Sequence, residues 1–240
     1  WSGGLNYFNI KTRKFSHYLP EENNADSLQS KNIFLLFKDN DKGILLGTWR
    51  GGLNYYNLAT KIFTAYKHDA QDYSSITTGQ IRSIYLDRQK NFWIGTDNGL
   101  NIMDRSTGTF KHYLHNQDDK FSISSNRIKS IFEDSKENLW IGTDTGLNLF
   151  DRKTEKFTSY TKRDGLPNDT IIAILEDNQG YLWMSTEHGL SRFDPDTEKF
   201  RNYDVNHGLP GNVFNRPAHL KTQQGELVFG STQGITIFDP

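Results

Sequence analysis

The sequence contains no cysteine, and this absence excludes several kinds of chemistry at once. Disulfide bonds, thiolate nucleophiles and cysteine-ligated zinc sites all require the sulfur atom of this side chain. The absence does not indicate a compartment, because a chain without thiols is suited to oxidising and reducing surroundings alike. Thiol chemistry is therefore excluded as the basis of function.

Long apolar runs are also missing from this chain, whose mean hydropathy is −0.72. No stretch approaches the roughly 20 apolar residues of a membrane-spanning helix, and no charged start followed by an apolar run marks a signal peptide. We expect contact with a membrane only through segments outside these 240 residues. Because the chain opens on Trp1 without a methionine, we expect a mature or excised segment of a longer protein.

Neither sign of charge is in excess, since 28 Lys and Arg residues stand against 29 Asp and Glu residues. No basic block is present that could hold a phosphate backbone, so nucleic acid is not an expected partner. The seven histidines are scattered without the spacings of zinc sites, and no nucleophile-elbow motif accompanies the serines. The sequence therefore predicts no metal centre, no catalytic triad and no cofactor.

What the sequence does contain is an internal repeat with a period of 43 to 48 residues. The clearest anchor is a glycine that precedes a leucine or isoleucine in every copy. A second anchor is the pattern F-x-x-Y, and a third is an isoleucine followed six residues later by an aspartate. Three anchors in a fixed order indicate a repeat architecture. The glycine anchors are Gly4, Gly52, Gly99, Gly146, Gly189 and Gly234.

Within one repeat the pattern is that of short β-strands. The runs at 128–133, 139–143, 147–151 and 157–161 are aromatic or β-branched, and turn-forming clusters separate them. No window shows a sustained apolar period of 3.6 residues, so we expect a helix content close to nil. Four short strands in about 45 residues form one blade of a β-propeller. The predicted fold is therefore an all-β β-propeller built from four-stranded antiparallel blades.

Counting strands gives about five blades' worth of chain in a single propeller segment, 1–240. Third-strand sequences occur in both the first and the last partial blade, so a closed five-bladed ring would hold one third strand too many. We therefore expect an arc of a larger, seven-bladed ring, whose open blade faces favour self-association, for example as a homodimer. The expected complete blades are 28–66, 76–113, 123–160 and 169–203, with partial blades at 1–18 and 213–239.

The repeat resembles that of a known family. The segments WIGTDNGLNIMD (93–104) and WIGTDTGLNLFD (140–151), together with the DGLPND segment that begins at Asp164, are similar to the two-component regulator propeller repeat. This resemblance implies the periplasmic or surface-facing sensor region of a hybrid two-component regulator, best known in Bacteroidetes. It also implies an oligosaccharide as the ligand and a histidine kinase outside this chain.

The main departures from the repeat lie in the loops between second and third strands, where the flanking Thr and Gly stay fixed. Loops on a fixed scaffold often carry recognition, although ordinary variation of solvated loops explains the same pattern. Trp49 offers an aromatic face for sugar C–H groups, and Arg50 could pair with a uronate or sulfate. In the last blade, Arg216 lies either in a bulge at a domain junction or in the pocket. The candidate ligand-binding residues are Trp49, Arg50, Asp97, Asn98, Asp144, Glu187, His188 and Arg216.

A glycosidase on this scaffold would need two facing carboxylates about 5 to 9 Å apart. The acids of the first strands lie instead in hairpin turns and recur with the repeat, apart from a lone Asp169. The acidic turn at 39–43 lacks the glycine and glutamate positions of a calcium loop, and a hairpin turn explains it. We therefore favour a non-enzymatic sensor of a glycan-derived ligand. The alternatives are a carbohydrate-active lyase or glycosidase, and a lectin or protein-interaction propeller.

Overall fold

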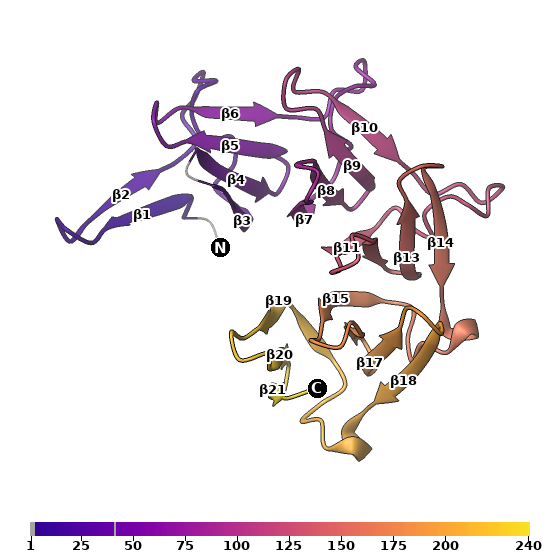
Figure 1. The fold of residues 1–240 in the computed structure, drawn as a ribbon. Helices are drawn as coiled ribbons and strands as arrows, with labels where there is room; N and C mark the ends of the chain where they lie inside the picture. The colour runs from indigo at the N-terminus through magenta and orange to yellow at the C-terminus, as the bar shows by residue number, and fades with distance from the viewer. Residues whose placement is uncertain (1–2, 41) are drawn as a thin grey trace. The chain divides into compact units, whose positions relative to one another are not determined.

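A computed structural model describes residues 3–40 and 42–240 of the chain (Figure 1). The described residues form six antiparallel sheets: four with four strands, one with two strands and one with three. In each sheet every strand pairs with the next one along the chain, as in a propeller blade. Within the described residues the only helical segments are single 3₁₀ turns, Lys162–Asp164 and Val205–His207. The predicted all-β propeller of four-stranded antiparallel blades is confirmed.

Two compact units contain these sheets, Trp1–His112 and Tyr113–Pro240. The strands that begin in the first unit are β1 (Leu5–Asn9), β2 (Lys14–Tyr18), β3 (Ile33–Asp39), β4 (Gly43–Thr48), β5 (Leu53–Asn57), β6 (Phe63–Tyr66), β7 (Ile81–Leu86), β8 (Phe92–Thr96), β9 (Gly99–Met103) and β10 (Phe110–Tyr113). The strands of the second unit are β11 (Ile128–Glu133), β12 (Leu139–Thr143), β13 (Gly146–Asp151), β14 (Lys156–Tyr160), β15 (Ile171–Glu176), β16 (Leu182–Thr186), β17 (Gly189–Asp194), β18 (Lys199–Tyr203), β19 (Phe214–Lys221), β20 (Leu227–Ser231) and β21 (Gly234–Phe238).

The second strand of a blade supplies side chains to two cores. In β16 every residue is buried, because successive side chains point to opposite faces of the sheet. Met184 joins one cluster with Trp140 of the preceding blade, whereas Trp183 joins another with Phe229 of the following blade. This two-sided burial explains why the second strands read as continuous apolar runs instead of alternating ones.

A buried aspartate organises the turn between the first and second strands. Asp134 Oδ1 accepts hydrogen bonds from the backbone N–H groups of Lys136 and Asn138, at 2.9 and 2.8 Å. Its Oδ2 accepts the indole N–H of Trp140 at 2.8 Å. The same indole bond, again at 2.8 Å, links Asp87 to Trp93 and Asp177 to Trp183. The aspartate anchor of the repeat is therefore structural. In the related turn at 39–43, residue 41 lies outside the described residues.

A recurring Thr, Gly and Asn hold the loops at the other end of the blades, as the third complete blade shows. Thr143 Oγ1 donates to the carbonyl of Gly146 at 3.1 Å, closing the β12–β13 turn. Gly146 has φ +142°, and a Cβ there would meet the carbonyl oxygen of Tyr160 at 2.5 Å. Asn148 Oδ1 accepts the backbone N–H of Ser124, in the segment that leads into β11, at 2.9 Å. Residues between these anchors can vary without loss of the scaffold.

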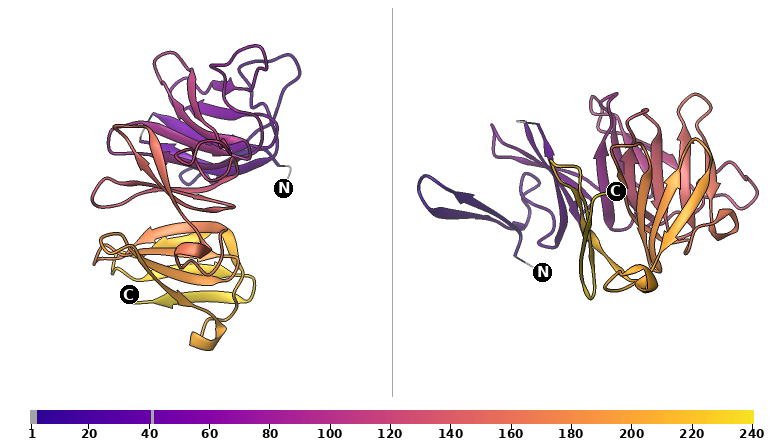
Figure 2. Two further views of the ribbon diagram at one scale, coloured as in Figure 1. Left: turned by 90° about the vertical axis from the view of Figure 1, so that its right-hand side faces the viewer. Right: turned by 60° about the horizontal axis from the view of Figure 1, so that its bottom comes forward.

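The two incomplete sheets depart from the regular blade. In the β1–β2 hairpin, Leu5 is buried against the first unit, whereas Phe8 and Phe15 near the turn are 44% and 60% exposed. Figure 2 shows this turn extending away from β3–β6. In β19 the pairing passes from Phe214 to His219 while the partner strand β20 advances only from Ser231 to Phe229. Extra residues therefore bulge out of β19, and Arg216 lies among them.

Candidate ligand-binding groove

Loops of the first unit surround a groove of about 510 Å³. It is bounded by the β4–β5 loop, the segment between β6 and β7, the start of β7, and the first residue of the β8–β9 loop. We call this hollow the Trp49 groove. Its polar and aromatic side chains include Trp49, Arg50, Lys67, His68, Arg82 and Asp97.

Trp49 supplies the aromatic surface of the groove. Its side chain is 50% exposed, and its ring lies 5.7 Å from the ring of Phe34, centroid to centroid. The backbone N–H of Trp49 donates to the carbonyl of Asn32 at 3.0 Å, and its carbonyl accepts the hydroxyl of Ser30 at 3.0 Å. An indole with one open face is thus held on a loop that is anchored on both sides.

Arg50 lies beside it in a loop that is one residue longer than its counterparts. Thr48 Oγ1 donates to the carbonyl of Gly52, four residues on, whereas Thr96 reaches only to Gly99, three residues on. Arg50 adopts φ +59° in this longer loop and is exposed. Its guanidinium forms no hydrogen bond or ion pair with any described residue. Five donors are therefore available to a ligand.

Arg82 and Asp97, which also line the groove, form an ion pair through two hydrogen bonds. Arg82 Nε donates to Asp97 Oδ1 at 2.7 Å, and Arg82 NH2 donates to Oδ2 at 3.0 Å. Both side chains remain about 30% exposed, at 28% and 30%. This fork-to-fork geometry fixes both groups and cancels the charge of the one carboxylate in the groove.

Lys67 and His68 follow β6 and have different kinds of hydrogen-bond partner. Lys67 Nζ donates to the side-chain carbonyl of Gln29 at 2.7 Å, a neutral partner that leaves the ammonium charge uncompensated. His68 Nδ1 lies 3.0 Å from the carbonyl of Ile76, and His115 Nδ1 makes the same contact with Ile123 at 2.8 Å. His68 is therefore part of the repeat scaffold, whereas Lys67 is specific to this blade.

The side chains that face each other at this end of a blade differ from one blade to the next. One is the second residue of the first strand, and the other is the first residue of the loop after the second strand. Lys129 forms an ion pair with Asp144, as Arg82 does with Asp97, and Arg127 adds a contact to Asp144 at 3.1 Å. The four position pairs are Phe34 with Trp49, Arg82 with Asp97, Lys129 with Asp144, and Ile172 with Glu187. Both aspartates are thus neutralised within their own blades.

The structure brings three of the eight candidate residues into one groove: Trp49, Arg50 and Asp97. The other five do not line it. Asn98 is exposed at the tip of the β8–β9 turn, and its backbone N–H donates to Thr96 Oγ1 at 2.9 Å. Glu187 and His188 are exposed in the β16–β17 turn. Asp144 and Arg216 occupy the ion pair and the bulge already described, in the second unit.

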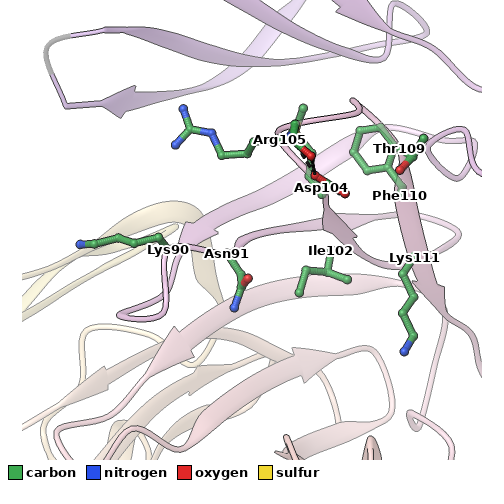
Figure 3. A pocket seen from close by; sticks show the side chains of 10 residues that line it. Lys90, Asn91, Ile102, Asp104, Arg105, Thr109, Phe110 and Lys111 are labelled. Atoms are coloured by element: carbon green, nitrogen blue, oxygen red, sulfur yellow. Dashed lines mark hydrogen bonds between the residues drawn. The ribbon is translucent and has the colours of Figure 1, made fainter.

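A second hollow, of about 570 Å³, lies on the β8–β10 side of the first unit (Figure 3). Ile102 lines this hollow and pairs with Trp93 of the second strand. Tyr55 occupies the equivalent position one blade earlier, where it pairs with Leu45. Tyr55 packs against the core between two blades, so this surface is a blade-packing face. Asp104 in the same hollow accepts bonds from Ser106 at 2.8 and 2.7 Å, which hold the pKa of its carboxyl below the ordinary value. These residues serve the scaffold.

A third hollow, of about 440 Å³, lies in the second unit and includes Trp183, Leu190 and Tyr203. Their counterparts one blade earlier, Trp140, Leu147 and Tyr160, are core residues. Repeat positions therefore build this hollow too, whereas Trp49, Arg50 and Lys67 of the Trp49 groove depart from the repeat. That difference makes the groove the candidate site.

The groove offers a ligand an aromatic surface and charged hydrogen-bond donors. A glycosidase requires two carboxylates, and Asp97 is the one carboxylate that lines this groove. Within residues 3–40 and 42–240, no group of three His, Asp or Glu side chains is placed to hold a metal ion. None of the helical segments in the described chain has the length and hydropathy that crossing a membrane requires.

Sequence reasoning missed Arg82, Lys67 and Gln80 as groove residues. Arg82 lies at an irregularity of the β7–β8 pairing, between Ile81 and Ser83, and its contact with Asp97 depends on that local geometry, which the sequence does not show. Lys67 and Gln80 gave no signal either, since they lie in the long connection between β6 and β7, whose path depends on tertiary packing.

The comparisons with known proteins agree with this architecture. A family model described as the two component regulator propeller matches residues 75–98, 122–145 and 165–188. Among curated proteins no match was found.

Solved structures give more distant comparisons. The extracellular domain of BT3049 from B. thetaiotaomicron, assigned to a hybrid two component system, is 29% identical with a TM-score of 0.82, over 100% of this chain and 31% of that one. The extracellular domain of BT4673 from the same organism, assigned to a one component system, is 21% identical with a TM-score of 0.68, over 100% of this chain and 40% of that one. Virginiamycin B lyase from Staphylococcus aureus shares the fold at 12% identity and a TM-score of 0.66, over 100% of this chain and 78% of that one.

This chain therefore spans less than half the length of the two extracellular domains. The three matched segments each run from the loop before a first strand to the turn after the second strand, so they coincide with the blade repeat. The repeat motifs, the matched segments and the shared fold agree: this chain carries three segments that match the two component regulator propeller model, and its fold is that of an extracellular domain assigned to a hybrid two component system.

Proposed function

We propose that this chain is the extracytoplasmic sensor propeller of a two-component signalling protein and has no enzymatic activity of its own. The three segments that match the two component regulator propeller model and the likeness to an extracellular domain assigned to a hybrid two component system support the proposal. In such a protein the propeller lies in the periplasm, and a histidine kinase outside this chain reads the bound state. The signal requires a ligand with different affinity for two arrangements of the sensor.

We further propose that the ligand is an oligosaccharide bound in the Trp49 groove. The observation that carries this proposal is the pairing of a half-exposed indole with an adjacent guanidinium that has no partner among the described residues. A sugar offers an apolar C–H face to the ring and hydroxyl oxygens to the donors. A hollow of about 510 Å³ also lies within the usual range for small-molecule sites, about 300–1,000 Å³.

A thermal-shift screen of the 240-residue chain against plant and host oligosaccharides tests this function. A ligand at 100 times its dissociation constant adds about 2.7 kcal/mol to the free energy of unfolding. For a chain of this size the melting temperature should rise by about 5–11 °C. Trp49→Ala should abolish the shift, whereas Tyr73→Ala should not, because Tyr73 is 84% exposed and does not line the groove. A shift that survives Trp49→Ala places the ligand elsewhere.

The enzymatic alternative has less support. Virginiamycin B lyase shows that a propeller of this fold can be an enzyme, but at 12% identity the likeness concerns the fold alone. In the Trp49 groove the carboxylate of Asp97 is engaged by Arg82 through two hydrogen bonds. Incubation of the chain with a bound oligosaccharide should therefore return the sugar unchanged, as chromatography of the recovered material would show.

A further inference from the structure

We infer that the Trp49 groove selects acidic saccharides, recognising a carboxylate or sulfate group through the side chains of Arg50 and Lys67. This inference rests on the proposed function, in which the groove binds an oligosaccharide. It adds the chemical class of the ligand and the residues that read its charge.

The first support is the charge that remains after the groove's own pairs are formed. Asp97 is the one lining carboxylate, and Arg82 neutralises it through two hydrogen bonds. Arg50 and Lys67 have no ion pair with any described residue. Two positive charges therefore border a hollow that holds no free negative charge, and a neutral ligand would leave both without a counter-ion.

The second support is that these cations are specific to this blade. The residues that correspond to Arg50 in the next three blades are Asn98, Thr145 and His188. In contrast, Lys129 and Arg127 in the second unit are both engaged by Asp144. Cations that serve the scaffold have carboxylate partners within the blade, whereas Arg50 has none.

The third support is the local geometry around Arg50. It follows Trp49 directly, in the loop that is one residue longer than its counterparts, and it adopts φ +59°. Eight other described residues besides glycine adopt such a backbone, so the left-handed conformation places Arg50 at the turn of its loop, directly beside the ring. A guanidinium beside an exposed ring can form a forked pair with a planar carboxylate or with sulfate oxygens while the ring covers the sugar face.

Calorimetric titration with matched ligand pairs tests the inference. The probes are trigalacturonic acid with its methyl ester, and a κ-carrageenan tetrasaccharide with its desulfated form, so that carboxylate and sulfate are tested separately. We expect at least one acidic probe to bind about 10-fold or more tightly than its neutral partner. Charge-assisted recognition should also weaken as sodium chloride is raised from about 50 to 300 mM, because salt screens exposed charges.

Three variants identify the residues that read the charge. Arg50→Gln and Lys67→Gln remove a charge but keep a hydrogen-bond donor, and each should weaken the acidic probe by about 10- to 100-fold. Each should weaken the neutral partner clearly less than the acidic probe, because the amide still donates to sugar hydroxyls but carries no charge. Lys14→Gln, on the exposed strand β2, is the matched control and should leave both affinities unchanged. Urea unfolding of each variant confirms that the fold is intact.

The outcomes separate this inference from the proposed function. Equal affinity for acidic and neutral partners, with binding still lost in Trp49→Ala, overturns the charge selection and leaves the groove as a saccharide site. Selective acidic binding that Arg50→Gln and Lys67→Gln do not change overturns the assigned residues. If no probe and no member of the oligosaccharide screen binds, both proposals are overturned.

Discussion

At the scale of single residues, a buried aspartate holds each complete turn between first and second strands. Asp134 is 2% exposed, and its two oxygens accept two backbone N–H bonds, the amide of Asn138 and the indole of Trp140. The indole N–H of Trp140, which is 1% exposed, would otherwise be buried without this acceptor, at a cost of about 1–3 kcal/mol. The carboxylate is thus stabilised by the donors that it satisfies.

Asp134→Ala should therefore destabilise the chain strongly, by about 3 kcal/mol, because the buried indole N–H and the part-buried donors of the turn lose their acceptor together. Asp151→Ala is the matched control, since Asp151 also accepts turn hydrogen bonds, from Lys153 and Thr154, but is exposed. Water can replace its contacts, so its loss should be much smaller. Urea unfolding followed by fluorescence measures both, and equal losses would contradict a structural role for the buried turn aspartate.

His219 makes the stability of the last sheet depend on pH. Burial lowers the pKa of its imidazole from the ordinary 6.5, and its Nδ1 is buried without a hydrogen-bond partner. The unfolded chain therefore takes up a proton at a higher pH than the folded chain does. The free energy contributed by the neutral imidazole is complete above pH 6.5 and is lost as the pH falls below that value.

The melting temperature should fall between pH 7.5 and pH 5.0 by more in the unmodified chain than in His219→Gln, which cannot titrate there. Differential scanning calorimetry at both pH values gives the comparison. His17→Gln serves as the control, because His17 is exposed on the β1–β2 hairpin. If His219→Gln and the unmodified chain lose the same stability, the imidazole titrates alike in both states of the chain.

At the scale of elements, the turn aspartate of the first complete blade binds an arginine of the following blade, where the equivalent aspartates of the next three blades bind a tryptophan indole of their own blade. Position 45, six residues after Asp39, holds Leu45 where the next three blades have tryptophan. Asp39 is 0% exposed, and Arg105, in the β9–β10 turn of the following blade, donates to its Oδ2 at 2.6 Å. Tyr55 adds a longer contact to the same oxygen at 3.4 Å. A charged pair thus ties β3–β6 to β7–β10.

Arg105→Met should destabilise the first unit by about 3 kcal/mol, because it leaves the Asp39 carboxylate buried without its cation. Adding Asp39→Asn should restore part of the loss, since the amide no longer carries a charge into the core. Urea unfolding of the two single variants and the double variant gives the coupling energy. A double variant as unstable as the sum of its parts would show that the two groups act independently.

At the scale of the whole molecule, the propeller could be predicted from the sequence because its anchors have structural duties that repeat. The glycine of the second–third turn, the aspartate before each second strand and the buried tryptophan recur every 43 to 48 residues. The seven-bladed ring and self-association stay predictions. The groove could be predicted only in part: Trp49 and Arg50 break the repeat visibly, whereas Lys67 becomes a neighbour of Arg50 through packing.

Apart from Arg216, the candidate residues were predicted from one pattern, variation in loop positions, which has two physical causes. A variable loop position signals either recognition or a local ion pair, and the sequence alone does not distinguish them. Asp97 and Asp144 differ from their counterparts because they form ion pairs with Arg82 and Lys129, which occupy the irregular position of their first strands. Arg50 varies without any partner in the described chain. Tertiary contacts, and not the loop sequence, decide whether a variable loop residue forms an ion pair within the blade or stays available for recognition.

The two compact units lead to a prediction about how losses of stability combine. Blades bury their faces against their neighbours, so the stability of a repeat protein is close to a sum over repeats and their interfaces. Asp134 and Arg105 lie in different units and share no hydrogen-bond partner among the described contacts. The losses of stability should therefore add within about 0.5 kcal/mol in Asp134→Ala/Arg105→Met. In contrast, Arg105→Met and Asp39→Asn share a contact and should couple by about 1 kcal/mol or more.

Urea unfolding of both double variants measures the two coupling energies side by side. If the coupling energy between Asp134 and Arg105 is as large as that between Arg105 and Asp39, the two units do not contribute independently to the free energy of unfolding.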